Sequence, residues 1–188
     1  MVADSLQAKA NVVKPFAGLQ AAAGPAKGRL DADQAAGDQL KRQGRYGEAV
    51  AAYRRAVLRP APTADLWRKL AEAYTNDNQL DEAVNAYQRA IALRPDYAKS
   101  RTELAYLFTR LDRYPEAFAQ LDSATTARPD YAWAHLVLGL LHFRQGNYPA
   151  AIGSYQGAIA AEAEYGEAWF NLGEVHLKQN DFDTAETA

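Results

Sequence analysis

Hydrophobic residues along much of the chain recur at the spacing of an α-helix. Between Leu66 and Asn76 they lie three or four positions apart, which places them on one face of a helix. A second helix is predicted from Leu80 to Leu93, and it ends before Pro95 because proline pushes its predecessor out of helical geometry. Asn78, between the two segments, belongs to the residue types that best tolerate the left-handed conformation at a helix end. The pattern therefore predicts a helix–turn–helix unit.

This unit returns along the chain with a period of 34 residues. The same step is kept by two columns of small residues and by a largely aromatic one: Gly37, Ala71, Ala105, Gly139 and Gly173; Ala49, Ala83, Ala117, Ala151 and Ala185; Tyr53, Tyr87, Leu121 and Tyr155. Where two helices cross closely, only Gly or Ala lets the backbones approach, and the aromatic column fills the adjoining holes. The turn of each unit is expected at Gly44, Asn78, Asp112, Gly146 and Asn180. We expect each hairpin to bury one face on its neighbour, so that no unit is stable alone.

The repeated residues resemble the tetratricopeptide repeat family. Its motif, which runs from a Trp through Leu-Gly or Leu-Ala to a final Pro, is present as Trp67, Leu70, Ala71, Tyr74, Asn78, Ala83, Tyr87, Ala90 and Pro95. The resemblance implies an all-α fold, a right-handed superhelical α-solenoid of antiparallel helix–turn–helix hairpins. It covers residues 30–188, with repeats at 30–63, 64–97, 98–131, 132–165 and, truncated, 166–188.

The two ends of the chain depart from the repeat. Residues 1–29 are rich in Ala, Gly and Lys and are predicted to be a tail or linker. The alternative is that their apolar residues dock on a surface of this molecule or of a neighbour. The fifth repeat stops three residues after Ala185, in the middle of its second helix. We therefore expect the chain to be a fragment of a longer protein.

Composition and charge narrow the classes of function. Hydrophobic residues make up 48% of the 188 residues, enough for a core, and the net charge of -2 argues against binding nucleic acid by neutralising phosphates. No segment approaches the roughly 20 apolar residues that span a bilayer, and no secretory signal is recognisable. We expect a soluble protein without membrane insertion, in the cytoplasm rather than in the periplasm or outside the cell. The absence of cysteine removes disulfides and thiolate metal sites.

No catalytic signature is present, and we expect no catalytic residue, no metal and no cofactor. His142 and His176 fall in an aromatic column of the repeat, and His135 takes the place of the motif Trp. Each is a packing position, whereas metal or base chemistry needs a second convergent group. Chaperone-binding members of the family grip a C-terminal carboxylate with two lysines, two asparagines and an arginine. The matching positions here hold Gln34, Asp38, Lys69, Lys99 and Glu103, so that binding mode is not expected.

In this family the first helix of each repeat lines the concave groove. The first helix of the fourth repeat, Trp133–Phe143, is apolar nearly all the way round, whereas a surface helix normally has a polar stripe. Apolar side chains left over after packing within the array resemble a binding hot spot. The predicted groove consists of Tyr106, Arg110, Trp133, Leu136, Leu140, Phe143, Arg144, Phe170, Leu177 and Lys178, with the three cations orienting acidic residues of a partner. Alternatively, this surface is buried by repeats beyond the chain, by residues 1–29 or by a second copy.

The leading hypothesis is a non-catalytic scaffold that binds an apolar or amphipathic peptide or helix of a partner protein in this groove. A second hypothesis makes the chain the targeting module of a larger enzyme, such as a transferase, whose catalytic part lies outside it. A third is self-assembly into a homo-oligomer through the apolar groove or the uncapped C-terminal end.

Overall fold

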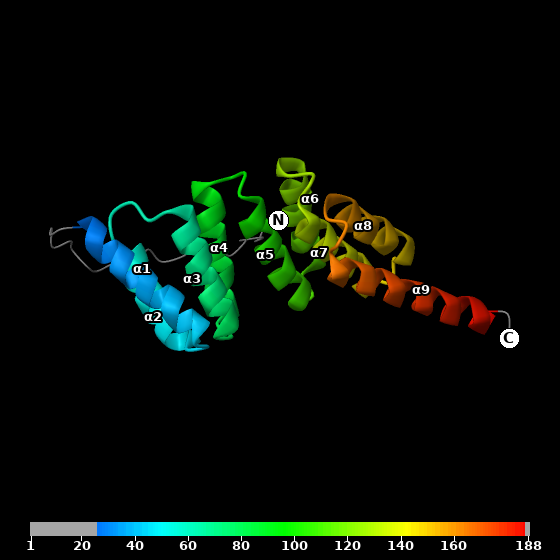
Figure 1. The fold of residues 1–188 in the computed structure, drawn as a ribbon, viewed down its shortest axis with the longest axis horizontal. Coiled ribbons are helices and arrows are strands. Elements are labelled where there is room, and N and C mark those ends of the chain that lie inside the picture. Colours follow the sequence, from blue (N-terminus) through cyan, green and yellow to red (C-terminus); the bar gives the residue numbers. More distant parts are fainter. Residues whose placement is uncertain (1–25, 187–188) are drawn as a thin grey trace, which may run out of the picture.

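The computed structural model describes residues 26–186, with the side chains of residues 32–179. Within that part the chain forms nine α-helices and no strand. They are α1 (Ala26–Arg42), α2 (Tyr46–Val57), α3 (Ala64–Asn76), α4 (Leu80–Leu93), α5 (Ala98–Arg110), α6 (Tyr114–Ala127), α7 (Ala132–Arg144), α8 (Tyr148–Ala161) and α9 (Gly166–Glu186). The helices follow one another in an elongated right-handed solenoid that runs from α1 to α9 (Figure 1). The predicted all-α repeat fold is confirmed.

Successive helices pair into four hairpins, α1 with α2, α3 with α4, α5 with α6 and α7 with α8. Each hairpin turns at a residue with positive φ, at Gly44 (73°), Asn78 (59°), Asp112 (56°) and Gly146 (72°). Glycine adopts this conformation without strain, and Asn and Asp tolerate it better than other residues. Four of the five predicted turns are therefore confirmed.

The two helices of a hairpin meet where a small residue lies against an aromatic ring. A Cβ added to Gly37 would lie 2.6 Å from Cε1 of Tyr53, and one added to Gly139 would lie 2.4 Å from Cε1 of Tyr155. Both distances are shorter than any ordinary carbon contact, so these rings press directly on the glycine backbone. The four members of the largely aromatic column are all buried. The predicted role of the small and aromatic columns is thus confirmed.

A second column links three of the first helices, α5, α7 and α9, to the loop before each of them. The side chains of Arg101, His135 and Trp169 each donate a hydrogen bond to the backbone carbonyl six residues earlier, at 2.8, 2.7 and 2.9 Å. His135 must carry its proton on Nε2 to donate to the carbonyl of Pro129. Each of these three side chains offers an N–H donor, which allows Arg and His to take the place of the motif Trp in α5 and α7.

The structure differs from the predicted boundaries at both ends. Helix α9 runs without a break through Asn180, so the fifth predicted turn is wrong. Eight residues follow Asn180 in the sequence, and a second helix that short buries too little surface to offset the broken helical hydrogen bonds. Helix α1 begins at Ala26, inside the predicted tail and directly after Pro25 in the sequence. Residues 1–25 lie outside the described part, so the tail prediction is untested there.

The contact between Gly139 and Tyr155 predicts opposite effects for two glycine substitutions. Gly139→Val should destabilise the protein by about 1–3 kcal/mol, because the new side chain collides with the buried ring. Gly153→Ala in α8 meets open space and should instead stabilise by about 0.5–1 kcal/mol through helix propensity. Urea unfolding followed by circular dichroism measures both. Equal changes in the two variants would contradict the packing described here.

Candidate functional site

The first helices of the repeats, α1, α3, α5, α7 and α9, together form one surface, here termed the first-helix face. A pocket of about 200 Å³ opens on it where α5, α7 and α9 meet. Its lining consists of Tyr106, Trp133, Leu136, Val137, Leu140, Glu167 and Asn171. The walls from α5 and α7 are apolar or aromatic, and the two residues from α9 are polar. This combination of an apolar cavity with a few convergent polar groups is typical of a binding site.

Four residues of the predicted groove line this pocket. Tyr106 is 39% exposed at its mouth, while Trp133 and Leu140 are half-buried. Leu136 is only 4% exposed, because it packs with Tyr155 of α8 and the residues of α9 around it. The structure therefore brings Tyr106, Trp133 and Leu140 together as reachable surface, with Leu136 beneath them.

The other six predicted groove residues do not line the pocket. Phe143 packs its ring against Tyr148, with 5.7 Å between centroids, and Arg144 lies close to Tyr114. Arg110 and Lys178 are exposed away from the cavity, and so are two large apolar residues of α9, Phe170 and Leu177. The pocket is thus smaller than the predicted groove.

Three lining residues were not among the predicted site residues: Val137, Glu167 and Asn171. Glu167 and Asn171 are four residues apart on α9, so they share one face of the helix and point into the same cavity. That spacing was visible in the sequence, but a search for apolar residues passes over a polar pair.

The first-helix face carries a network of ion pairs over α1, α3 and α5. Its centre is the guanidinium of Arg68, 3.1 Å from Asp65, 3.3 Å from Glu72 and 3.1 Å from Glu103. The Arg68 side chain is 8% exposed, and burial alone would lower its pKa. The surrounding acidic groups outweigh burial and raise the pKa of Arg68, so the residue stays charged.

Two lysines complete this network. Lys69 lies 2.8 Å from Asp38, and Lys41 lies 2.8 Å from Glu72. The hydroxyl of Tyr53 donates to Asp38 at 2.6 Å. These charges satisfy one another within the protein, so they offer little net attraction to a charged partner. Asp38, Lys69 and Glu103 occupy positions of the family's carboxylate grip, and the network that holds them is incompatible with that mode.

Glu103 lies at the junction between the ion network and the pocket, one helical turn before Tyr106. One of its oxygens contacts Arg68, whereas the other, Oε2, is buried without a hydrogen-bond partner among the described residues. Burial raises the pKa of Glu103 to about 7, despite the attraction of Arg68 and Lys99 and assisted by repulsion from Glu72. This carboxyl therefore titrates near neutral pH.

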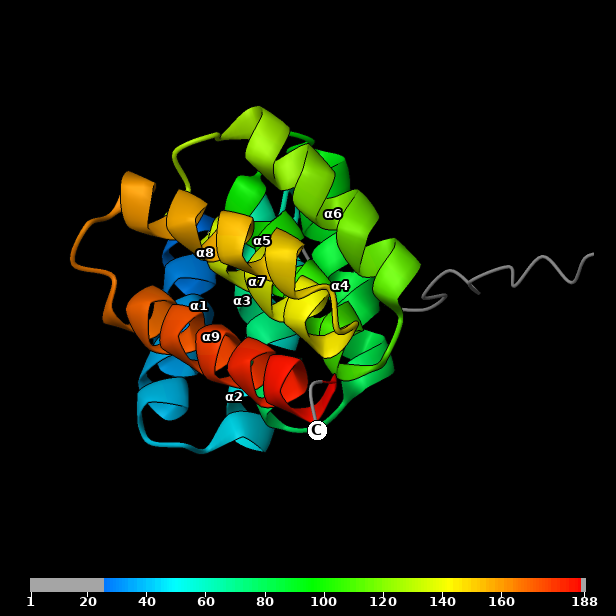
Figure 2. The same ribbon diagram turned by 90° about the vertical axis from the view of Figure 1, so that its right-hand side faces the viewer.

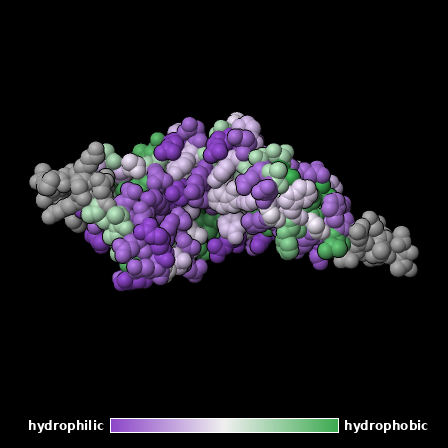
Figure 3. Space-filling view, viewed as in Figure 1, coloured by the Kyte–Doolittle hydropathy of each residue, from purple (hydrophilic) through white to green (hydrophobic). Residues whose placement is uncertain are grey.

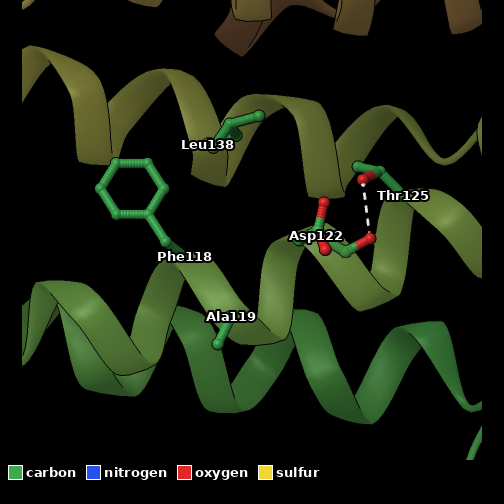
Figure 4. A pocket seen from close by; sticks show the side chains of 5 residues that line it. All are labelled: Phe118, Ala119, Asp122, Thr125 and Leu138. Atoms are coloured by element: carbon green, nitrogen blue, oxygen red, sulfur yellow. Dashed lines mark hydrogen bonds between the residues drawn. The ribbon is translucent and has the colours of Figure 1, made fainter.

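A second, larger cavity of about 390 Å³ lies on another side of the array, between α6 and α7 (Figure 4). It is lined by Phe118, Ala119, Asp122, Thr125 and Leu138. The hydroxyl of Thr125 donates to backbone carbonyls of its own helix, at 2.9 and 3.2 Å. The polar lining residues, Asp122 and Thr125, both come from α6, and Leu138 is the lining residue from α7. Polar groups therefore do not converge on this cavity from two sides, and it has less of the character of a binding site.

The surface changes in character along the array. Hydrophilic residues dominate over α1–α4, and paler or hydrophobic residues are more frequent over α7–α9 (Figure 3).

Among the described residues, no group of three His, Asp or Glu side chains lies close enough to hold a metal ion. No helix of the described part is long and apolar enough to cross a membrane. His142 is a packing residue, since its ring lies 5.0 Å from Phe118 and burial lowers its pKa.

Helical hairpins stacked one on the next define the class of helical-repeat solenoid proteins. A family model described as tetratricopeptide repeat matches residues 35–84 and 136–188. A second model, described as TPR repeat, matches residues 71–112. The chain belongs to the tetratricopeptide repeat family. No curated protein sequence matches it significantly.

Solved structures share the fold. A crystal structure of YrrB, described as a TPR protein with an unusual peptide-binding site, has 21% identity and a TM-score of 0.66, with 75% of this chain and 73% of that chain covered. MamA from Desulfovibrio magneticus RS-1 has 18% identity and a TM-score of 0.72, with 87% and 92% covered. The first TPR of Spaghetti (RPAP3), bound to an HSP90 peptide, has 19% identity and a TM-score of 0.59, with 63% and 94% covered.

The position of Glu103 predicts a pH dependence of stability. Its folded pKa of about 7 exceeds the ordinary value of 4.5, so its contribution is full below pH 4.5 and is lost as pH rises through 7. From pH 5 to pH 8 the wild type should therefore lose on the order of 2 kcal/mol of stability relative to Glu103→Gln. Urea midpoints of both proteins at the two pH values measure this difference. Comparison with the variant cancels the titration of His142, and parallel pH profiles would contradict the assignment.

Proposed function

We propose that this chain is a non-catalytic scaffold that binds a peptide segment or helix of a partner protein in the pocket on the first-helix face. The observation that carries the proposal is the pocket itself, whose apolar walls of Tyr106, Trp133 and Leu140 face Glu167 and Asn171. Membership of the tetratricopeptide repeat family supports it, as does the peptide binding named for YrrB and RPAP3.

The size of the pocket favours a single anchoring side chain. At about 200 Å³ it is smaller than the roughly 300–1,000 Å³ of small-molecule sites. A Leu, Phe or Trp of the partner would bury its apolar surface against Trp133 and Leu140, as such anchors do at binding hot spots. An amphipathic segment is therefore the proposed ligand, as expected from the apolar fourth repeat.

The polar wall suggests which groups flank the anchor. The amide of Asn171 can both donate to and accept from a peptide backbone, and the carboxylate of Glu167 attracts a Lys or Arg. Arg110, Arg144 and Lys178 do not line the pocket. We therefore propose that the partner carries a basic residue next to its apolar anchor, rather than the acidic residues that those three cations suggested. If the chain is instead the targeting module of a larger enzyme, we propose that it binds its partner through the same pocket.

A charge at Leu140 tests the site. Peptides selected from a random library on the wild-type protein should bind about tenfold or more weakly to Leu140→Asp, because a carboxylate cannot be buried in the pocket without cost. Leu93→Asp is the matched control, since Leu93 is 55% exposed at the end of α4 and does not line the pocket. Isothermal titration calorimetry gives the affinities. Equal loss in both variants, or in neither, would contradict the proposed site.

The acidic wall allows a second test with the same peptides. Glu167→Gln should weaken peptides that carry Lys or Arg by several-fold and leave peptides without a cation unchanged. The weakening should shrink at high salt, because Glu167 is exposed and its attraction is screened. A library that selects only acidic peptides would count against the proposed ligand chemistry.

A further inference from the structure

The pocket on the first-helix face is lined by polar groups that form no hydrogen bond within the described part of the chain. These groups are the indole N–H of Trp133, the hydroxyl of Tyr106 and the amide of Asn171. By contrast, the hydroxyl of Tyr97, in the ion network, donates to Asp65 at 2.9 Å. The pocket therefore offers a ligand three hydrogen-bond donors that the protein itself does not use.

The same residues supply a flat apolar surface. The rings of Tyr131 and Trp133 meet edge to face, with 6.2 Å between centroids and 81° between planes. Such a contact helps to fix the orientation of both rings. Trp133 is half-buried and Tyr106 is 39% exposed, so each leaves part of its ring accessible. A ligand thus meets aromatic surface and hydrogen-bond donors side by side.

A helical ligand cannot use these donors. In an α-helix the backbone carbonyls bond within the helix, and only the last four are free. A helix laid across the pocket would cover the indole of Trp133 and the hydroxyl of Tyr106 without supplying backbone acceptors. Covering a donor without giving it a partner is unfavourable, which counts against a helix as the ligand.

A β-strand ligand lacks a partner of another kind. An added strand needs the open edge of a sheet, and the described part contains helices and no strand. Seen along the array, α5 and α7 lie nearer the centre than α4 and α6 (Figure 2). A ligand in the pocket therefore crosses the side chains of first helices, whose backbone groups are bonded within each helix.

The polyproline II conformation fits both features of the pocket. It has no internal hydrogen bonds, so every backbone carbonyl can accept one from the protein. Proline has no N–H, so it places no unpaired donor against the apolar walls of Val137 and Leu140. Aromatic-lined grooves are the usual docking surfaces for such segments. We propose that the pocket binds its partner as a proline-rich segment in the polyproline II conformation, an inference that rests on the proposed function.

The geometry of this conformation sets the spacing of the ligand. With three residues per turn and a rise of about 3.1 Å, residues i and i+3 lie on one face, about 9 Å apart. One apolar residue enters the cavity, and a proline three positions away lies on the rings of Tyr106 and Trp133. These two residues and Asn171 donate to the carbonyls between them. A Lys or Arg at one end of the segment pairs with Glu167.

Two peptide libraries test the conformation of the ligand. Both are eight residues long and random except at the third and sixth positions, which are proline in one library and alanine in the other. Alanine is the strongest helix former, so the second library admits helical ligands. Selection from an equal mixture on the wild-type protein should enrich the proline library, with Lys or Arg at an end of the selected peptides. Isothermal titration calorimetry should show that replacing both prolines by alanine weakens a selected peptide about tenfold or more.

Protein variants test the donors. Tyr106→Phe removes one hydroxyl and Trp133→Phe removes the indole N–H, while each keeps an aromatic ring. Each should weaken the selected peptides several-fold, because a carbonyl of the ligand loses its donor. Tyr46→Phe is the matched control, since Tyr46 is half-buried at the start of α2 and does not line the pocket. Circular dichroism confirms that each variant is folded.

Transferred nuclear Overhauser effects on a selected peptide report its bound conformation. A polyproline II segment gives contacts between neighbouring residues only, whereas a helix also gives contacts between residues three or four apart. A helical bound peptide, tighter binding from the alanine library, or wild-type affinity in both Tyr106→Phe and Trp133→Phe would overturn the inference. The proposed function would survive these outcomes if Leu140→Asp still weakened the same peptides. If neither library gave a peptide that Leu140→Asp weakens, the proposed function would fall and this inference with it.

Discussion

The close approach of two helices within each hairpin is the constraint on which the structure depends. A tyrosine ring can lie directly on the backbone of Gly37 or Gly139 only because that position has no Cβ. The approach fixes which face of each helix is buried. The repeat of 34 residues places a small residue, Gly or Ala, and a buried Tyr or Leu at the same two positions of every hairpin. First helices are thereby aligned on one face of the array and second helices on the other. The pocket and the ion network both follow from that alignment.

The first-helix face has two parts, which differ in whether their charged side chains are paired with one another within the protein. Over α1 and α3, and up to Glu103 of α5, acidic and basic side chains neutralise one another around Arg68, and a partner would have to break these pairs to use them. From Tyr106 onward the face is apolar with an acidic and an amide group, and the pocket opens there. Glu103 lies at the division, with a pKa raised to about 7 mainly by burial. The two halves share one fold and differ in which side chains remain available to contact a ligand.

The sequence predicted the fold in detail because the repeat period identifies columns, and a column of small or aromatic residues has a single packing role. The site was predicted less well. Periodicity placed Leu136 and Phe143 on the same helix as Trp133, but their burial depends on α8 and α9 and on the Tyr148 ring, which are tertiary contacts. The Arg68–Glu103 pair joins residues one repeat apart and was likewise invisible to a search for motifs. The turn expected at Asn180 is absent, because the short segment after it buries too little surface as a second helix to offset the broken helical hydrogen bonds.

The central claim is that a partner peptide binds in the second half of the first-helix face and not in the first. Amide chemical-shift mapping of the isotope-labelled chain, titrated with a peptide selected on the wild type, tests it most directly. The account predicts the largest shift changes at Tyr106, Val137, Leu140, Glu167 and Asn171, with the amides of Asp38, Arg68 and Glu72 unchanged. Shift changes centred on Arg68 and Glu72, with no change at the residues that line the pocket, would contradict it.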